Sequence, residues 1–175
     1  MRICVVSAQW KPIITGGGGV AVLNLVRELA KENSVTVYTF GVGDLPQEES
    51  IRLGKGCVRV RRVFTRDSSH ISTPFDGTKE EEIARLQEFI NKVSALIDCE
   101  EFDAIHLHGH FAVPSLSKLL KKKSCRSTIV VTIHAFESII ELEKGAFASR
   151  KSIYDKIVSM ERDALKYADI ITVGS

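Results

Sequence analysis

Short apolar runs alternate with segments of helical periodicity along the whole 175-residue chain. The apolar runs, rich in β-branched residues, occupy 2–8, 34–40, 57–64, 103–108, 127–133 and 169–173. The helical pattern, with apolar residues three and four apart, occupies 20–31, 78–98, 114–123 and 149–168. This alternation predicts an α/β fold, with a doubly wound, Rossmann-like parallel sheet. Because crossovers between parallel strands are right-handed, we expect the strand order 3-2-1-4-5-6.

Two local signals refine this prediction. The sequence TKEE places Thr78 at a helix N-cap and Glu81 at its third position, which is a capping box. The third apolar run, CVRVRRVF, carries Arg59, Arg61 and Arg62. Charged side chains commonly protect the outermost strand of a sheet, so this run is expected to lie at the edge.

Composition excludes several classes of protein. A net charge of +2 argues against a nucleic-acid partner bound through bulk charge. No apolar run reaches the roughly 18 residues of a membrane span. The four cysteines form no CxxC pair, so they are interpreted as unpaired, buried residues in a reducing, cytoplasmic compartment: Cys4, Cys57, Cys99 and Cys125.

The mouth of the predicted sheet gathers three unusual features. In open α/β sheets, ligands bind beyond the carboxyl ends of the strands, near the point where the strand order reverses. A glycine run, Gly16 to Gly19, follows the first strand. The stretch HLHGH, residues 106–110, leaves the fourth strand, and His134 follows the fifth. These three segments are therefore expected to meet at one edge.

The glycine run suits a phosphate group. Gly16, Gly17, Gly18 and Gly19 can expose backbone N–H groups in front of a helix N-terminus, where the helix dipole favours an anion. The pattern is not GxGxxG, and Phe40 rather than an acidic residue closes the second strand, which argues against a dinucleotide. The alternative is a loop that only permits a tight turn.

The histidines of HLHGH divide into two groups. His106 and His108 share one face of a strand, and the deeper His106 is expected to be a core residue with a hydrogen-bond partner. His108 and His110 lie at the ligand edge and are candidate pocket residues. HLHGH also resembles the HxHxDH motif of metallo-β-lactamases, but Gly109 replaces the aspartate. We therefore predict no metal site.

His134 is the strongest single candidate for catalysis. It directly follows a buried strand, where its imidazole can donate a hydrogen bond to a sugar hydroxyl or a phosphate oxygen. Glu137 is a candidate to orient it. The alternative is that His134 only caps a loop or helix.

Four segments, taken in order, resemble landmarks of the N-terminal domain of GT-B glycosyltransferases of family 4. They are GGGGVAVLNLVRELAKENSVTVYTF, DAIHLHGHFAVPSLSKLL, VVTIHAFES and ALKYADIITVGS. The family includes glycogen synthases and mannosyltransferases that act on lipid-linked inositol. The resemblance implies transfer of a sugar from a nucleotide-sugar donor with retention of configuration and without a catalytic metal or other cofactor.

The resemblance also implies roles for individual residues. Gly16 to Gly19 correspond to the loop that reaches the donor phosphates, and His134 to a histidine that contacts the reacting sugar or the acceptor. His106, His108, Pro114 and Ser115 match a family pattern of two alternating histidines followed by a Pro-Ser pair.

The resemblance further implies a two-domain enzyme. Residues 1–175 would form the N-terminal, acceptor-binding domain, and a nucleotide-sugar-binding domain would lie outside this sequence. The stop at ITVGS, directly after a strand, favours the same expectation. The partners would be a nucleotide-sugar donor and a sugar, polysaccharide or lipid-linked acceptor.

Three alternatives remain open from the sequence. A sugar-nucleotide epimerase shares the two-domain architecture, and a non-catalytic α/β module could bind a protein partner. The first strand ends in SAQW, without the acidic pair expected of a receiver-like module. The lysine-rich helix that begins near Pro114 could make weak peripheral membrane contact, or be an ordinary helix with a solvated basic end.

Overall fold

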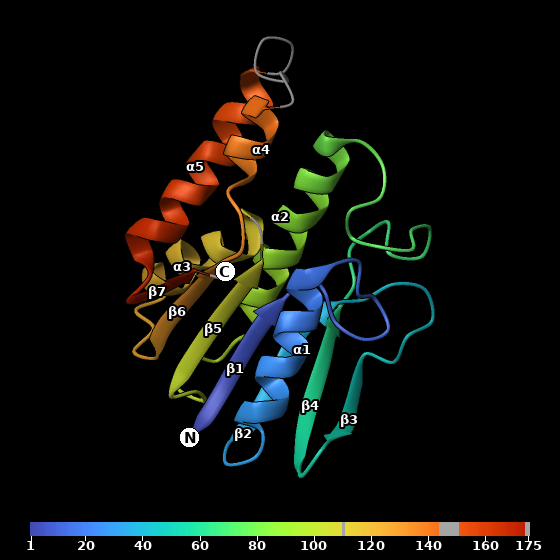
Figure 1. Cartoon of the computed structure of the whole chain (residues 1–175), viewed down its shortest axis with the longest axis vertical. Coiled ribbons are helices and arrows are strands. Elements are labelled where there is room, and N and C mark those ends of the chain that lie inside the picture. Colours follow the sequence, from blue (N-terminus) through green and yellow to red (C-terminus); the bar gives the residue numbers. More distant parts are fainter. Residues whose placement is uncertain (110, 144–150, 174–175) are drawn as a thin grey trace.

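A computed structural model describes residues 1–109, 111–143 and 151–173, which form a seven-stranded sheet covered by helices (Figure 1). The strand order is β3-β4-β2-β1-β5-β6-β7, and every pair is parallel except β3–β4. The strands are β1 (Arg2–Ser7), β2 (Ser34–Phe40), β3 (Glu48–Leu53), β4 (Gly56–Val63), β5 (Ala104–Gly109), β6 (Thr128–Ile133) and β7 (Ile170–Val173).

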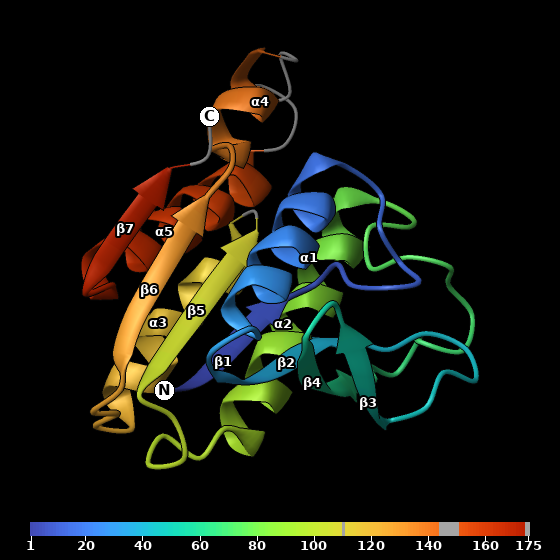
Figure 2. The same ribbon diagram turned by 60° about the horizontal axis from the view of Figure 1, so that its bottom comes forward.

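The helices lie on both faces of the sheet. They are α1 (Gly17–Leu29), α2 (Lys79–Leu96), α3 (Ala112–Lys122), α4 (Glu137–Glu143) and α5 (Lys151–Tyr167). Figure 2 shows α1 in front of the sheet, with α2, α3 and α5 behind it. The chain moves in opposite directions from β1 to β2 and from β5 to β6, so right-handed crossovers place their helices on opposite faces.

The predicted fold class is confirmed, and the six predicted strands follow the predicted order. The prediction that the third of them lies at the sheet edge is wrong. β3 pairs antiparallel with this strand, β4, and covers it. Its carboxylates neutralise the arginines, since Arg61 Nε lies 2.9 Å from Glu48 and Arg62 pairs with Glu49. The arginines of β4 thus pair with acidic residues of the neighbouring strand β3 rather than protecting an open edge.

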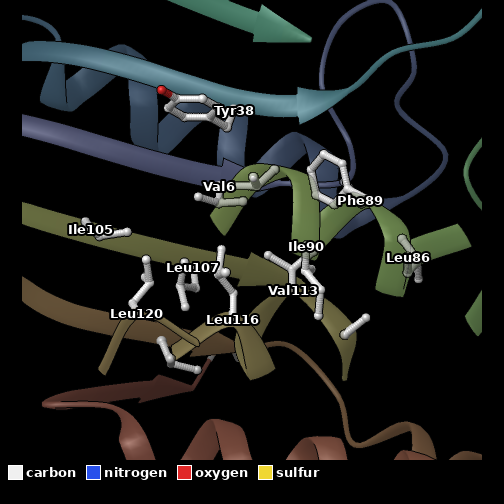
Figure 3. Packing of buried hydrophobic residues seen from close by; sticks show 14 of the residues in the cluster. Val6, Tyr38, Leu86, Phe89, Ile90, Ile105, Leu107, Val113, Leu116 and Leu120 are labelled. Atoms are coloured by element: carbon white, nitrogen blue, oxygen red, sulfur yellow. The ribbon is translucent and has the colours of Figure 1, made fainter. Parts of the chain in front are cut away.

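Two hydrophobic clusters hold the layers together. The larger lies between the sheet and α2, α3 and α5, and includes Leu107 of β5, Leu116 and Leu120 of α3, and Phe89 and Ile90 of α2 (Figure 3). Leu107, Leu116 and Leu120 are fully buried, and each such side chain contributes about 2 kcal/mol of hydrophobic stabilisation. The smaller cluster packs α1 against β1, β2 and β4.

The helices differ from the prediction at the start of α1 and in one additional helix. α1 begins at Gly17, three residues before the predicted start, because glycines lack the apolar periodicity that marks a helix. The short helix α4 was not predicted. The capping box of Thr78 and Glu81 is confirmed at the start of α2. The predicted start of the last helix, at 149, lies outside the described residues.

The interpretation of the cysteines as unpaired and buried is wrong for three of the four. Cys99, after α2, and Cys125, after α3, form a disulfide, with their Cα atoms 5.2 Å apart. Cys4 is buried and unpaired, as predicted, but Cys57 is exposed. The pairing escaped sequence analysis because the loops before β5 and β6 meet only once these strands are adjacent.

In the described part of the chain, no helix is long and apolar enough to cross a membrane. The basic helix α3 directs its apolar side inward, where Leu116 and Leu120 are buried. Lys118 and Lys121 form ion pairs of 2.8 Å with Asp163 and Asp169. The apolar side of α3 therefore packs inside the fold, and two of its lysines already have acidic partners.

Candidate functional site

The glycine run, His108 and His134 meet at the carboxyl edge of the sheet, as predicted. They border two adjoining hollows that share Gln9, Gly18 and Phe75. The inner cavity, lined by Gly18, Phe75, His108 and His134 among others, has room for about one water molecule, at about 20 Å³. The outer pocket, of about 630 Å³, lies beside Gly16 to Gly18 and the first turn of α2.

The glycines occupy the first turn of α1 rather than a loop before it. Gly16 is the N-cap, without a side-chain cap, and the first turn contains no acidic residue. The first N–H groups of a helix have no intrahelical acceptor, and the helix dipole is positive there. The start of α1 therefore presents donors to the outer pocket in an arrangement that suits an anion.

None of these four glycines has a positive φ, so their backbone conformation does not require glycine. Close packing accounts for Gly19, whereas a Cβ on Gly18 would be in ordinary van der Waals contact. A Cβ on Gly18 would lie 3.7 Å from Cδ2 of His134, and a Cβ on Gly19 only 2.7 Å from Oε1 of Gln9. Gly16 and Gly17 have nothing within 4 Å of such a Cβ. The run thus contains one tightly packed glycine, Gly19, one in ordinary contact with His134, Gly18, and two with open space beside them.

This difference predicts that the two substitutions differ in their effect on stability. The free energy of unfolding of Gly19→Ala should be lower than that of Gly17→Ala by about 1 kcal/mol or more, because its methyl group would press on Gln9 and on Ile14. Gly17→Ala should raise the free energy of unfolding by up to about 1 kcal/mol, since alanine is the better helix former. Urea unfolding of both variants measures the difference. Equal stabilities would show that the start of α1 is not packed as described.

The histidines form a row at the ends of β5 and β6. His106 Nε2 lies 2.7 Å from Thr132 Oγ1, which confirms the predicted hydrogen-bond partner, but His106 is half-buried rather than a core residue. His108 Nδ1 lies 3.3 Å from His134 Nε2, and the two ring centres are 5.4 Å apart. His108 Nε2 is buried in the lining of the inner cavity, without a hydrogen-bond partner among the described residues. His110 lies outside those residues.

Burial keeps two of these imidazoles neutral. It lowers the pKa of His106 from 6.5 to about 4 and, aided by the neighbouring histidines, that of His108 to about 3. At neutral pH each ring therefore carries one proton and offers one acceptor nitrogen. Either His108 Nδ1 or His134 Nε2 carries the proton that they share.

These lowered pKa values predict acid sensitivity. The unfolded chain takes up protons near pH 6.5 but the folded chain only near pH 3–4, so stability present above pH 6.5 is lost as the pH falls through this window. The loss is about 1.4 kcal/mol per pH unit for each histidine. Between pH 7 and pH 5, His108→Asn should reduce the loss by about 2 kcal/mol.

Denaturant unfolding at both pH values measures this effect. His70→Asn is the matched control, because His70 is exposed and lies outside the site. An equal loss of stability in the His108→Asn variant and the unmodified chain would contradict the buried, neutral state of His108.

A charged group that sequence analysis missed lines the outer pocket. Lys79 Nζ lies 2.8 Å from Glu82 and 2.9 Å from Glu137. Glu137, a candidate to orient His134, accepts a hydrogen bond from Lys79. The acidic residues after Thr78 were recognised only as helix-start signals, and nothing local shows that Glu137, 58 residues from Lys79, lies beside them.

Arg85 of α2 fixes the loop that closes the site. Its guanidinium donates to the carbonyl oxygens of Pro74 and Asp76 at 2.9 and 2.8 Å, and Nε lies 2.7 Å from the carboxylate of Asp67. Phe75, between the two bound carbonyls, lines both hollows. A buried arginine thus sets the position of an aromatic wall, which its place in a helical pattern did not reveal.

The turn after β5 explains the departure from the metallo-β-lactamase pattern. Gly109 has a φ of +137°, a backbone conformation that residues with a side chain rarely adopt. Within residues 1–109, 111–143 and 151–173, no three His, Cys, Asp or Glu side chains are grouped to hold a metal ion. The mostly parallel sheet is also unlike the antiparallel opening of that fold.

Comparison with known proteins identifies relatives of this arrangement. The model of the family described as Glycosyltransferase Family 4 matches residues 15–175. No curated protein sequence matches the chain.

Solved structures share the fold at low sequence identity. Two structures of sucrose-phosphate synthase from Thermosynechococcus elongatus align with TM-scores of 0.74 and 0.64, at 17% and 15% identity. They cover 99% and 100% of this chain, which spans 42% and 77% of theirs. A UDP-forming α,α-trehalose-phosphate synthase from Burkholderia xenovorans, in complex with glucose-6-phosphate, aligns at 0.57 and 14% identity over 98% of this chain and 40% of its own.

Proposed function

The chain belongs to glycosyltransferase family 4, and we propose that it is the N-terminal domain of a retaining enzyme that transfers a sugar from a nucleotide-sugar donor to an acceptor hydroxyl. One observation carries the proposal. His134 lies against the glycine start of α1, with its Cδ2 only 3.7 Å from where a Gly18 Cβ would be. His134 and the first turn of α1 therefore line the inner cavity together, and the same turn also lines the adjoining outer pocket.

The start of α1 supplies the electrostatic part of this function. Glycosyl transfer builds negative charge on the leaving diphosphate, and fixed N–H groups stabilise such charge without reorganisation. The first turn of α1 has glycines where side chains would obstruct, and no acidic residue that would repel the diphosphate. Gly16 and Gly17 are the most accessible donors, since nothing lies within 4 Å of a Cβ at either.

His134 supplies the positioning part. The transition state of glycosyl transfer is oxocarbenium-like, and a hydrogen bond held at the reacting sugar can strengthen as the transfer proceeds. The interaction with His108 at 3.3 Å fixes the ring of His134. In this proposal His134 contacts the transferred sugar or the acceptor, while His108 lines the cavity behind it.

The family assignment favours a transferase over an epimerase or a partner-binding module. The proposed partners are a nucleotide-sugar donor and an acceptor with a free hydroxyl, and a second domain would supply the nucleotide site. We further propose that no metal takes part. Elemental analysis of protein purified without chelators should then find less than one equivalent of zinc, and a full equivalent lost in His106→Ala and His108→Ala would contradict this.

The two-domain proposal has a direct test. The 175-residue chain should unfold cooperatively on heating. It should release no nucleoside diphosphate from UDP-, GDP- or ADP-sugars in the presence of sugar acceptors. The longer protein that includes a nucleotide-binding domain should do so. Steady turnover by the 175-residue chain alone would overturn the proposal that it is half of an enzyme.

Peripheral membrane contact by α3 has weak support. Its leucines face the core, and Lys118 and Lys121 are already in ion pairs. Sedimentation with anionic vesicles should therefore equal sedimentation with neutral vesicles. A clear excess with anionic vesicles, lost in Lys122→Gln, would restore the membrane hypothesis.

A further inference from the structure

Away from the start of α1, the side of the outer pocket formed by α2, α4 and the loop before α2 has an acidic lining that the transfer reaction alone does not explain. Resting on the proposed function, we propose that the acceptor is an uncharged polyhydroxylated molecule, such as a free sugar or cyclitol, rather than a sugar phosphate. The charged side chains that line the pocket in the described part of the chain are Asp76, Lys79, Glu82 and Glu137. Glu82 and Glu137 share the single cation, and the carboxylate of Asp76 accepts hydrogen bonds from Ser72 and Thr73 of its own loop, so the net charge of this side is negative.

The single cation is not available for a phosphate. Lys79 Nζ already contacts Glu82 and Glu137 at 2.8 and 2.9 Å, and these two carboxylates raise its pKa against the opposing effect of burial. A phosphate would have to displace one of two carboxylates that are largely buried. Arg85, which lies nearby, is held by Asp67 and two backbone carbonyl groups.

The same groups suit hydroxyls. Lys79 Nζ lies within 2.9 Å of one oxygen of each carboxylate, and a carboxylate has two oxygens that can each accept more than one hydrogen bond. Carboxylates with free lone pairs are strong acceptors for hydroxyl groups, whereas like charges placed against them are repelled. Phe75 adds an apolar wall, against which the C–H face of a sugar ring can pack.

The inner cavity points to the same chemistry. His108 is 4% exposed, and its buried Nε2 has no partner among the described residues. The space in front of it, about 20 Å³, suits one water molecule or one hydroxyl group. A hydroxyl both donates and accepts, so it can pair with Nε2 in either neutral tautomer. A phosphate is too large for this space and has no cation there.

Matched sugar pairs test the proposal on the 175-residue chain. Glucose, mannose and myo-inositol are titrated beside glucose 6-phosphate, mannose 6-phosphate and inositol 1-phosphate, with amide and imidazole NMR signals as the readout. We expect at least one neutral member to shift the signals of Gly18, Phe75 and His108. The phosphorylated form of that sugar should bind at least tenfold more weakly.

Charge removal provides the second arm. The affinity ratio between the neutral sugar and its phosphorylated form is the gap that these carboxylates should set. Glu82→Gln and Glu137→Gln should each reduce this gap by about fivefold or more. Glu80→Gln is the matched control, since Glu80 is exposed on the same helical turn and does not line the pocket. It should leave the gap unchanged. A gap that narrows equally in all three variants would overturn the role of the pocket carboxylates.

The remaining outcomes also decide. Equal or tighter binding of a sugar phosphate overturns the proposal. Binding of no sugar overturns the assignment of this pocket to the acceptor. Titration with UDP and inorganic pyrophosphate separates these failures from failure of the proposed function. Signals of Gly16 to Gly18 that shift with either probe keep the transferase proposal, and their silence counts against it.

Discussion

His134→Ala is expected to lower kcat about a hundredfold in the full-length enzyme, with a smaller rise in KM. Loss of one hydrogen bond to a group that gains charge in the transition state typically costs about 3 kcal/mol. If the bond strengthens as the sugar is transferred, the loss falls on kcat more than on binding. Steady-state kinetics with the donor and acceptor varied separately measure both constants.

The control for this variant is stability, because His134 also contacts His108 at 3.3 Å. Unfolding curves should show that the His134→Ala variant remains folded at the assay temperature. His70→Ala, at an exposed position outside the site, should retain normal kinetics. If the folded His134→Ala variant keeps a near-normal kcat/KM, His134 is part of the scaffold, and the site does not lie at this edge.

Gly17→Val is expected to lower kcat/KM about a hundredfold, by keeping a phosphate from the helix N-terminus. A Cβ at Gly17 meets nothing within 4 Å in the protein, so a side chain can leave the backbone there without overlap at its first carbon. It would project from a residue that lines the outer pocket, where the donor phosphates are proposed to bind. The fold should therefore survive while binding of the diphosphate suffers.

A graded series separates steric blocking from damage to the fold. Gly17→Ala should cost less activity than Gly17→Val, and both should unfold at or above the denaturant concentration of the unmodified chain. Affinity for inorganic pyrophosphate should fall in the same order. A folded Gly17→Val variant with normal kcat/KM would mean that the start of α1 does not hold the donor.

Particular strands show how far local pattern reaches. The apolar β-branched runs of β1, β2 and β6 are nearly continuous, and such runs form where both sheet faces are covered. They were predicted to within one residue at most ends. β3 was missed, because EESIRL is largely polar and becomes a strand only by pairing its acidic residues with the arginines of β4.

The candidate site divides in the same way. Gly16 to Gly19, His108 and His134 were found from sequence because each follows a recognisable strand, and strand ends in a parallel sheet share one edge. Lys79, Glu82 and Arg85 were missed, because in sequence they belong to an ordinary helix with a capping box. Their functions depend on partners elsewhere in the chain.

The sequence by itself determined the fold class, the strand order and the edge where the site lies, because hydrophobic periodicity and right-handed crossovers act through local geometry. Only the tertiary structure decided which side chains meet. His108 contacts His134 across 26 residues and Lys79 contacts Glu137 across 58. Such contacts depend on the register of neighbouring strands. Burial, which also arises only in the folded chain, lowers the pKa values of His106 and His108. No single segment contains that information, because it arises only when distant segments share one low-dielectric space.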